Sequence, residues 1–272
     1  MTINSYLSNG SFAMNKPDTE IKRWGIVVIQ SLNPNDYKTG EILYHDVLQY
    51  KEYHKGESFT SFYDVNSSDE FRLAVQTIED SLSEGDILTL QIETHGCDDG
   101  IWLNNGDILK WKEFYDIIRP LNIKTGHLLF VVMAMCKSIA MISAINPEKR
   151  APYRAFICTT RVVTSNEIYR GFLAFYEKYF NMLDIMQALN ALQNEVKDDN
   201  GYSPFQALSA ESVFDETFNP YRNISSLVDN QLKQLNIPIT DSTKSIMAYY
   251  IQQLLENLHN MFYNYYNFKD LY

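Results

Sequence analysis

A histidine and a cysteine each follow an apolar stretch of strand length, and these two residue types can serve as a nucleophile and its base. Residues 87–94 lead into His95, and residues 127–135 lead into Cys136. A thiolate attacks carbonyl carbons, and a neighbouring imidazole can accept and return the proton. In open α/β sheets, ligands bind beyond the carboxyl ends of the parallel strands. If the two strands are neighbours, the sequence predicts that imidazole and thiol meet at that edge.

The other cysteines have different settings. Cys97 follows Gly96 and precedes an Asp-Asp turn, so we interpret it as a bystander, whereas Cys158 lies within an apolar stretch and is expected in the core. A count of 3 cysteines without regular spacing does not suit a disulfide framework and favours a reducing compartment. A zinc site built from His95 and the cysteines is the alternative, but no Cys-x-x-Cys spacing supports it. We therefore expect no metal ion.

The composition is that of an ordinary globular protein. Of the 272 residues, 45% are hydrophobic and 21% are charged, which suits a folded chain with a core. The net charge of −11, from 34 acidic and 23 basic side chains, argues against binding a nucleic-acid backbone. No apolar run reaches the roughly 18 residues of a membrane span, and residues 1–16 carry no stretch of signal-peptide type. We expect a cytoplasmic protein.

Strand-like and helix-like stretches alternate along most of the chain. Strands are expected over residues 24–29, 58–65, 87–94, 101–103, 127–135 and 153–159, and helices over 68–82, 111–121, 167–180 and 183–195. A short helix is expected directly after Cys136, where its amino terminus would favour the thiolate. Residues 41–53 alternate in part, which predicts a hairpin-like excursion, and residues 214–220 are expected as a terminal strand or loop. The alternation predicts an α/β fold with a mostly parallel sheet flanked by helices.

We divide the chain into three parts. Residues 1–20 are a polar lead-in, residues 21–222 form the α/β domain, and residues 223–272 form a helical C-terminal extension rich in aromatic side chains. Helices are expected in the extension over residues 225–235 and 242–266. Either the extension packs on the α/β domain, or its aromatic face is a docking surface for a regulatory protein partner.

In order and in strand context, two motifs resemble those of the caspase-like cysteine peptidases of clan CD. This group includes caspases, metacaspases, separase, gingipains and the CHAT-domain proteases. The first motif is His95-Gly96, and the second is Ala134-Met135-Cys136-Lys137-Ser138. The turn, short strand and helix expected between them also resemble the group, as does the spacing of 136 − 95 = 41 residues. The resemblance covers residues 24–194.

The resemblance implies a caspase-like three-layer sandwich and a cysteine endopeptidase that cleaves a specific protein substrate with a His-Cys dyad and no cofactor. It implies that Cys136 is the nucleophile, that His95 protonates the leaving amine and then activates water, and that the main-chain N–H groups of Gly96 and Cys136 bind the oxyanion. It also implies a role like that of bacterial effector proteases in immunity, such as antiviral defence, or programmed death. Met135 departs from the family pattern, and no charged pocket motif can be placed, which leaves subfamily and substrate preference open.

Two polar residues near the expected site are candidates for substrate binding. Glu93 shares a strand face with His95, so it either orients His95 or attracts a basic side chain, or it is an ordinary polar residue near a strand end. Arg161 follows the strand over residues 153–159, near the edge where the fold implied by the resemblance builds its S1 pocket. It either receives an acidic substrate side chain or is a solvated loop residue.

Two other functions compete with the peptidase. A catalytically silent caspase-like scaffold would regulate a partner through the C-terminal helices, although the presence of both His95 and Cys136 counts against it. A non-proteolytic hydrolase or transferase on a doubly wound sheet is the third possibility. No glycine-rich phosphate loop follows Ile29, which argues against nucleotide chemistry.

Overall fold

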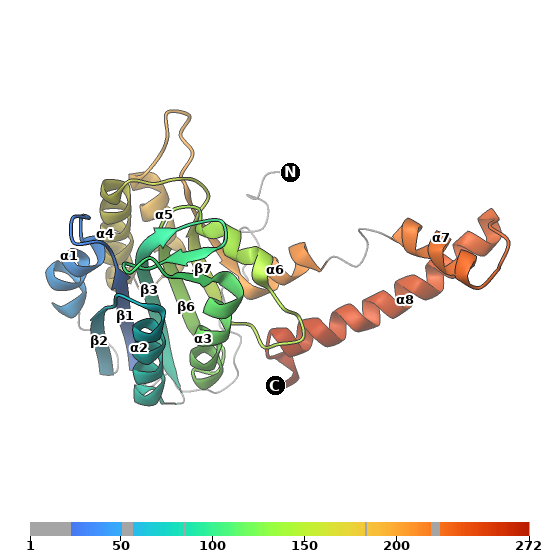
Figure 1. The fold of residues 1–272 in the computed structure, drawn as a ribbon, viewed down its shortest axis with the longest axis horizontal. Helices are drawn as coiled ribbons and strands as arrows, with labels where there is room; N and C mark the ends of the chain where they lie inside the picture. The colour runs from blue at the N-terminus through green and yellow to red at the C-terminus, as the bar shows by residue number, and fades with distance from the viewer. Residues whose placement is uncertain (1–22, 51–56, 84, 183, 219–223, 272) are drawn as a thin grey trace. The chain divides into compact units, whose positions relative to one another are not determined.

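The structure is a computed structural model. It describes residues 23–50, 57–83, 85–182, 184–218 and 224–271. By its internal contacts the chain divides into two units, one made of residues 1–144 and 151–210 and the other of residues 145–150 and 211–272. Figure 1 shows the elements of each unit. The expected lead-in over residues 1–20 lies outside the described residues.

The first unit is built on a mixed, mostly parallel β-sheet (Figure 1). Its main strands are β1 (Arg23–Ser31), β2 (Glu57–Asp64), β3 (Asp86–Gly96), β6 (Leu129–Ala134), β7 (Ala155–Thr159) and β8 (Phe205–Ser209). They lie in the order β2-β1-β3-β6-β7-β8, and only the β7–β8 pair in this series is antiparallel. Two short strands, β4 (Gly100–Trp102) and β5 (Ile108–Lys110), form a hairpin that pairs with the end of β3. Strands β6 and β7 are buried throughout, as strands covered on both faces must be.

Helices cover both faces of the sheet. The helices of this unit are α1 (Thr39–Asp46), α2 (Ser68–Ser81), α3 (Trp111–Lys124), α4 (Ser165–Met182) and α5 (Ile185–Glu195), with the 3₁₀ segments η2 (Leu48–Tyr50) and η3 (Ser138–Ala144). α2 packs on α3 and η3 packs on α3 at one face, while α1 and α5 both pack on α4 at the other. α2 illustrates why such a helix forms where it does. Ser67 caps its start by accepting a hydrogen bond from the Glu70 N–H, and Phe71, Val75 and Ile78 recur at helical spacing on the buried side.

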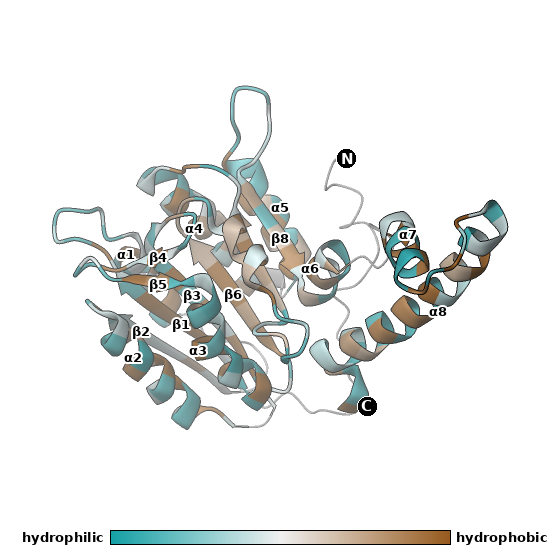
Figure 2. Cartoon of the chain, turned by 45° about the vertical axis from the view of Figure 1, so that its right-hand side comes forward, coloured by the Kyte–Doolittle hydropathy of each residue, from teal (hydrophilic) through white to brown (hydrophobic). Residues whose placement is uncertain are grey.

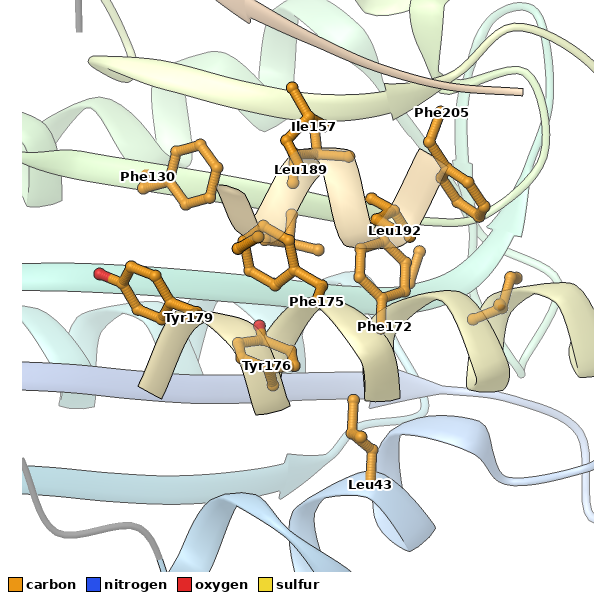
Figure 3. Close-up of a cluster of buried hydrophobic side chains, with 14 of the residues drawn as sticks. Leu43, Phe130, Ile157, Phe172, Phe175, Tyr176, Tyr179, Leu189, Leu192 and Phe205 are labelled. Atoms are coloured by element: carbon orange, nitrogen blue, oxygen red, sulfur yellow. The ribbon is translucent and has the colours of Figure 1, made fainter. Parts of the chain in front are cut away.

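A hydrophobic cluster lies between the sheet and the helices α1, α4 and α5 (Figure 3). Its aromatic members come mainly from α4, where Phe175 stacks on Tyr179 with ring centroids 5.8 Å apart. Ala134 at the end of β6 belongs to this cluster, and the partly buried side chain of Cys136 packs against it. The cluster therefore fixes the face of the sheet on which the cysteine lies. In Figure 2 the central strands are brown, in keeping with their burial on both sides.

The predicted α/β fold with a mostly parallel sheet flanked by helices is confirmed. The hairpin expected over residues 41–53 is wrong, because the described part of this range forms α1 and η2; residues 51–53 lie outside the described residues. Leu43, Tyr44, Val47 and Leu48 all pack on the core cluster. Their spacing follows the helical period rather than the strand period, since the same face returns every three to four residues.

The strand or loop expected over residues 214–220 is also wrong in its described part. The helix α6 (Ala210–Thr217) occupies it, and the last strand of the sheet, β8, lies just upstream at residues 205–209. Phe205, Ala207 and Ser209 are buried while the residues between them are only partly so. This alternation is the signature of a strand with one covered face.

The second unit is helical and aromatic. It contains most of α6, together with α7 (Ile224–Gln234), α8 (Asp241–Tyr266) and the 3₁₀ segment η4 (Lys269–Leu271). The ring of Phe214 contacts the rings of Phe218, His259, Tyr263 and Tyr266. Arg150 pairs with Asp270, and its guanidinium lies 4.2 Å from the centroid of the Tyr265 ring. Across the described residues, no helix has the length and apolar character needed to cross a membrane.

Candidate active site

The strands β3 and β6 are adjacent and parallel, which is the condition for the expected meeting of His95 and Cys136. Residues 88–93 of β3 pair in register with residues 129–134 of β6. In this register Glu93 pairs with Ala134. His95 comes two residues after Glu93, and Cys136 comes two residues after Ala134. Residues two apart point to the same side of a strand and paired residues share a face of the sheet, so His95 points to the face of Ala134. Cys136 lies just beyond the end of β6, and its side chain packs against the hydrophobic cluster that contains Ala134.

Gly96 brings the two strand ends into main-chain contact. A Cβ at Gly96 would lie 2.1 Å from the carbonyl oxygen of Cys136 and 3.1 Å from the side chain of Met135. A main-chain oxygen cannot move aside for such a contact, so only glycine fits this position. The two residues whose N–H groups are the expected oxyanion donors are therefore neighbours in space.

The Cys136 thiol is held by the main chain of Val163. Its sulfur lies 3.4 Å from the Val163 carbonyl oxygen, to which the thiol can donate, and 3.4 Å from the Val163 nitrogen, whose N–H donates to the sulfur. The next residue, Lys137, has a φ of 52°, and its N–H donates to the Arg161 carbonyl at 3.2 Å. The chain thus turns sharply at the cysteine, through a left-handed conformation that non-glycine residues adopt at a cost.

The short helix expected after Cys136 is present, as a 3₁₀ helix. The segment η3 is a 3₁₀ helix of 7 residues. Its start is tied to β7, since the Ser138 hydroxyl accepts a hydrogen bond of 2.9 Å from the Thr159 N–H. A 3₁₀ segment of this length does not favour the thiolate as a longer helix would, because it sums few aligned peptide dipoles.

His95 is turned toward Asp36, in the loop that follows β1. The two side chains meet at 2.8 Å, between His95 Nε2 and Asp36 Oδ2. The Asn33 N–H and side-chain amide donate to the same carboxylate at 2.8 and 3.2 Å. The hydrogen bond from His95 holds the pKa of Asp36 below its ordinary value, so the carboxylate form meets the imidazole. The His95 side chain is 48% exposed, which leaves the ring open to ligands.

This pairing assigns different roles to the two ring nitrogens. An ionised carboxylate only accepts hydrogen bonds, so Nε2 of His95 carries the proton toward Asp36. In the neutral imidazole, Nδ1 is then the nitrogen with a free lone pair. That nitrogen can serve as a base.

The sequence analysis does not identify Asp36, which lies in the loop between β1 and α1. The signal was present, since an acidic residue shortly after β1 lies at the same sheet edge as the end of β3. Val163 acts through its main chain, so its side-chain type carries no signal.

Glu93 is brought into a buried polar network rather than to His95. Its carboxylate accepts hydrogen bonds from the Thr39 hydroxyl at 2.7 Å and from the Gln91 amide at 2.5 Å. The Tyr176 hydroxyl donates to Gln91 at 2.5 Å, which extends the network to α4. Burial raises the pKa of Glu93 to about 7. The network joins β3, α1 and α4 beneath the site.

Arg161 lies beside the site through its main chain, with its side chain turned to Glu167. The guanidinium donates to Glu167 Oε1 at 2.7 Å. The same contact holds the pKa of Glu167 below its ordinary value. In this conformation the guanidinium already has an acidic partner, so a substrate carboxylate would have to compete with Glu167.

The remaining cysteines occupy different environments. The Cys97 thiol donates to the Gly100 carbonyl at 3.3 Å, in the turn that leads into β4. Cys158 is fully buried in β7, where burial raises the pKa of its thiol. In the part of the chain that the structure describes, no three His, Cys, Asp or Glu side chains are grouped as a metal site would require.

Comparison with known proteins finds no protein-family model that matches the chain and no curated protein that matches it.

Proposed function

We propose that this protein is a cysteine endopeptidase of the caspase-like type, with Cys136 as the nucleophile and His95 as the base and acid. One observation carries the proposal: adjacent parallel strands lead to these two residues, and Gly96 packs against the Cys136 carbonyl. The hairpin β4–β5 and the helix α3 between the two motifs support it, because the resemblance implies a turn, short strand and helix there. The sheet with helices on both faces supports a caspase-like three-layer sandwich.

The proposed reaction uses the side chains already described. The Cys136 thiol gives its proton to His95 Nδ1, and the sulfur attacks the carbonyl carbon of the scissile peptide bond. The oxyanion accepts hydrogen bonds from the Gly96 and Cys136 N–H groups. His95 then passes the proton to the leaving amine and takes one from the water that hydrolyses the thioester. Asp36 keeps the imidazole oriented with Nδ1 toward the reaction.

The proposed substrate is a specific protein in the cytosol, and the proposed role is that of an effector in immunity or programmed death. This part of the proposal depends on the resemblance of the two motifs to clan CD peptidases. The chemistry itself needs only peptide and water, so it requires no cofactor.

Unbiased cleavage of a peptide library tests the proposed activity. The wild-type protein and the Cys97→Ala variant are expected to cleave, whereas Cys136→Ala and His95→Ala are expected to lose cleavage. Cys97→Ala is the matched control, because it removes a partly exposed thiol from the adjoining turn. Circular dichroism checks that each variant is folded. Equal cleavage by the wild-type protein and Cys136→Ala would overturn the proposal.

A second candidate function, a binding module acting through the C-terminal helices, is favoured by the exposed face of α8. Large apolar side chains remain exposed there at intervals of three or four residues: Ile246, Tyr250, Leu254, Leu258, Met261 and Tyr265. The helical period places them on one face, and contiguous exposed apolar surface marks interaction sites. If the protein acts as a scaffold, Leu254→Glu combined with Leu258→Glu abolishes its biological effect while Cys136→Ala preserves it. The peptidase proposal expects the loss with Cys136→Ala.

A further inference from the structure

The β4–β5 hairpin presents two exposed apolar side chains in line with His95. His95 pairs in register with Trp102 across the β3–β4 ladder, and Trp102 pairs with Ile108 across the β4–β5 ladder. Directly paired residues in antiparallel strands point to the same face, so imidazole, indole and isoleucine side chains form one row. Trp102 is 52% exposed and Ile108 is 49% exposed.

The opposite side of the hairpin is buried, so the row of exposed side chains faces outward. Ile101 and Leu109 alternate with the exposed pair and are fully buried. The Leu103 N–H donates to the Asp107 carbonyl at 2.9 Å and closes the hairpin turn. The hairpin is therefore anchored by its inner face, and its outer face presents Trp102 and Ile108, with the exposed Lys110 beside them.

The row extends from His95 on the side away from Cys136. The Asn104 N–H in the hairpin turn donates to the hydroxyl of Ser31, at the end of β1, at 3.0 Å. The hairpin thus lies on the β1 side of β3, whereas Cys136 follows β6 on the other side (Figure 2). The order across the strand ends is Cys136, His95, Trp102 and Ile108.

We propose that Trp102 and Ile108 bind an apolar side chain of the substrate on the leaving-amine side of the scissile bond. The inference rests on the proposed function, in which His95 gives a proton to the leaving amine. The chain that follows the cleaved bond must then begin near His95 and continue away from Cys136, over the row. Neighbouring strands lie about 4.8 Å apart and an extended peptide advances about 3.3 Å per residue, so one of the first three residues after the bond reaches Trp102.

The two side chains are specificity determinants in this proposal and take no part in the chemistry. An indole and an isoleucine side chain offer apolar area without charge, so they favour Leu, Ile, Met or Phe in the substrate over Asp, Glu or Ser. Removing a large apolar contact from a substrate pocket typically changes discrimination by about tenfold to a few hundredfold.

Library cleavage by Trp102→Ala and by a matched control tests this subsite. Leu73→Ala is the control, because Leu73 is an exposed apolar residue on α2 in the same unit. The wild-type protein and Leu73→Ala are expected to show apolar enrichment at one of the first three positions after the cleaved bond. Trp102→Ala is expected to lose about tenfold of that preference, mainly through a higher KM for apolar substrates.

Labelling of Cys136 by a peptidyl electrophile that occupies only the acyl side separates the two proposals. Labelling at wild-type rate in Trp102→Ala shows that the variant is folded and that its nucleophile is intact. If the wild-type protein cleaves without apolar enrichment after the cleaved bond, or if Trp102→Ala keeps that enrichment, the proposed subsite is wrong and the proposed peptidase activity is unaffected. Absence of Cys136-dependent cleavage in the wild-type protein overturns both.

Discussion

Gly96 touches the main-chain carbonyl of Cys136, and a Cβ in its place would stand 2.1 Å from that oxygen. We expect Gly96→Ala to lower the free energy of unfolding by about 2 kcal/mol, because the clash is with main chain rather than with a flexible side chain. The rate of peptide cleavage should fall even under conditions where the variant is fully folded, since the displaced atoms belong to the nucleophile. Urea denaturation and cleavage rates measure the two effects.

Gly106→Ala is the control for that substitution. A Cβ at Gly106 meets nothing within 4 Å, although its φ of 92° makes alanine strained there. The control should cost about 1 kcal/mol of stability and leave cleavage unchanged. A Gly96→Ala protein as stable and active as this control would contradict the close contact.

Asp36→Asn tests whether the carboxylate positions His95. We expect kcat to fall about tenfold with little change in KM, because an amide can also donate to the ring and no longer fixes the proton on Nε2. The lowered pKa of Asp36 means that the stabilising interaction is present above the ordinary value of 3.8 and is lost as the pH falls through the folded-state pKa. The stabilities of the wild-type protein and Asp36→Asn should therefore converge in acid.

Asp98→Asn is the matched control for Asp36→Asn. Asp98 is an exposed carboxylate that lies 3.6 Å from the ammonium group of Lys137, next to the candidate nucleophile. Its substitution should leave kcat and the pH profile unchanged. An Asp36→Asn enzyme with the wild-type kcat and pH profile would remove Asp36 from the proposed mechanism.

Glu93→Gln should change how stability depends on pH. Burial raises the pKa of Glu93 to about 7 from 4.5, so the folded protein binds this proton more tightly than the unfolded chain does. The contribution of Glu93 to the free energy of unfolding is therefore most favourable below pH 4.5. It declines by about 3 kcal/mol as the pH rises to 7. Glutamine can still accept from Gln91 and can donate to the Thr39 oxygen, so the variant should be more stable than the wild-type protein at pH 8.

Urea denaturation at about pH 5 and pH 8 measures this difference. Glu148→Gln, at an exposed position, is the control and should leave the pH dependence of the wild-type protein unchanged. If Glu93→Gln loses as much stability between the two pH values as the wild-type protein does, Glu93 is not the group responsible.

The three thiols should differ in their reaction with an irreversible peptidyl electrophile. We expect Cys136 to be labelled in the folded protein, because a bound peptide places its electrophilic carbon at that sulfur. Cys158 should remain unlabelled until the protein unfolds, since burial both raises the pKa of its thiol and excludes the reagent. Mass spectrometry of the labelled peptides gives the distribution. Label found mainly on Cys97 would reverse the assignment of the nucleophile.

Local patterns were sufficient to predict the parts of the fold that rest on short-range preferences. The apolar runs before His95 and Cys136 predicted β3 and β6, and the helix expected over residues 68–82 corresponds to α2. In the described part of residues 41–53, a strand pattern and a helix pattern compete, because tyrosine, leucine and valine suit a half-buried strand as well as one face of a helix. Packing of that face on the core selected the helix.

The partners of the site residues depend on which strands lie side by side. Asp36 and His95 are 59 positions apart, and they meet because β1 and β3 are parallel neighbours in register. Glu93 shares a strand face with His95, as its spacing requires, yet its carboxylate turns to Thr39 under α1. Periodicity assigns a side chain to a face, because the backbone repeat is local. What meets that face follows from the alignment of distant segments, which is a property of the assembled sheet and its helices.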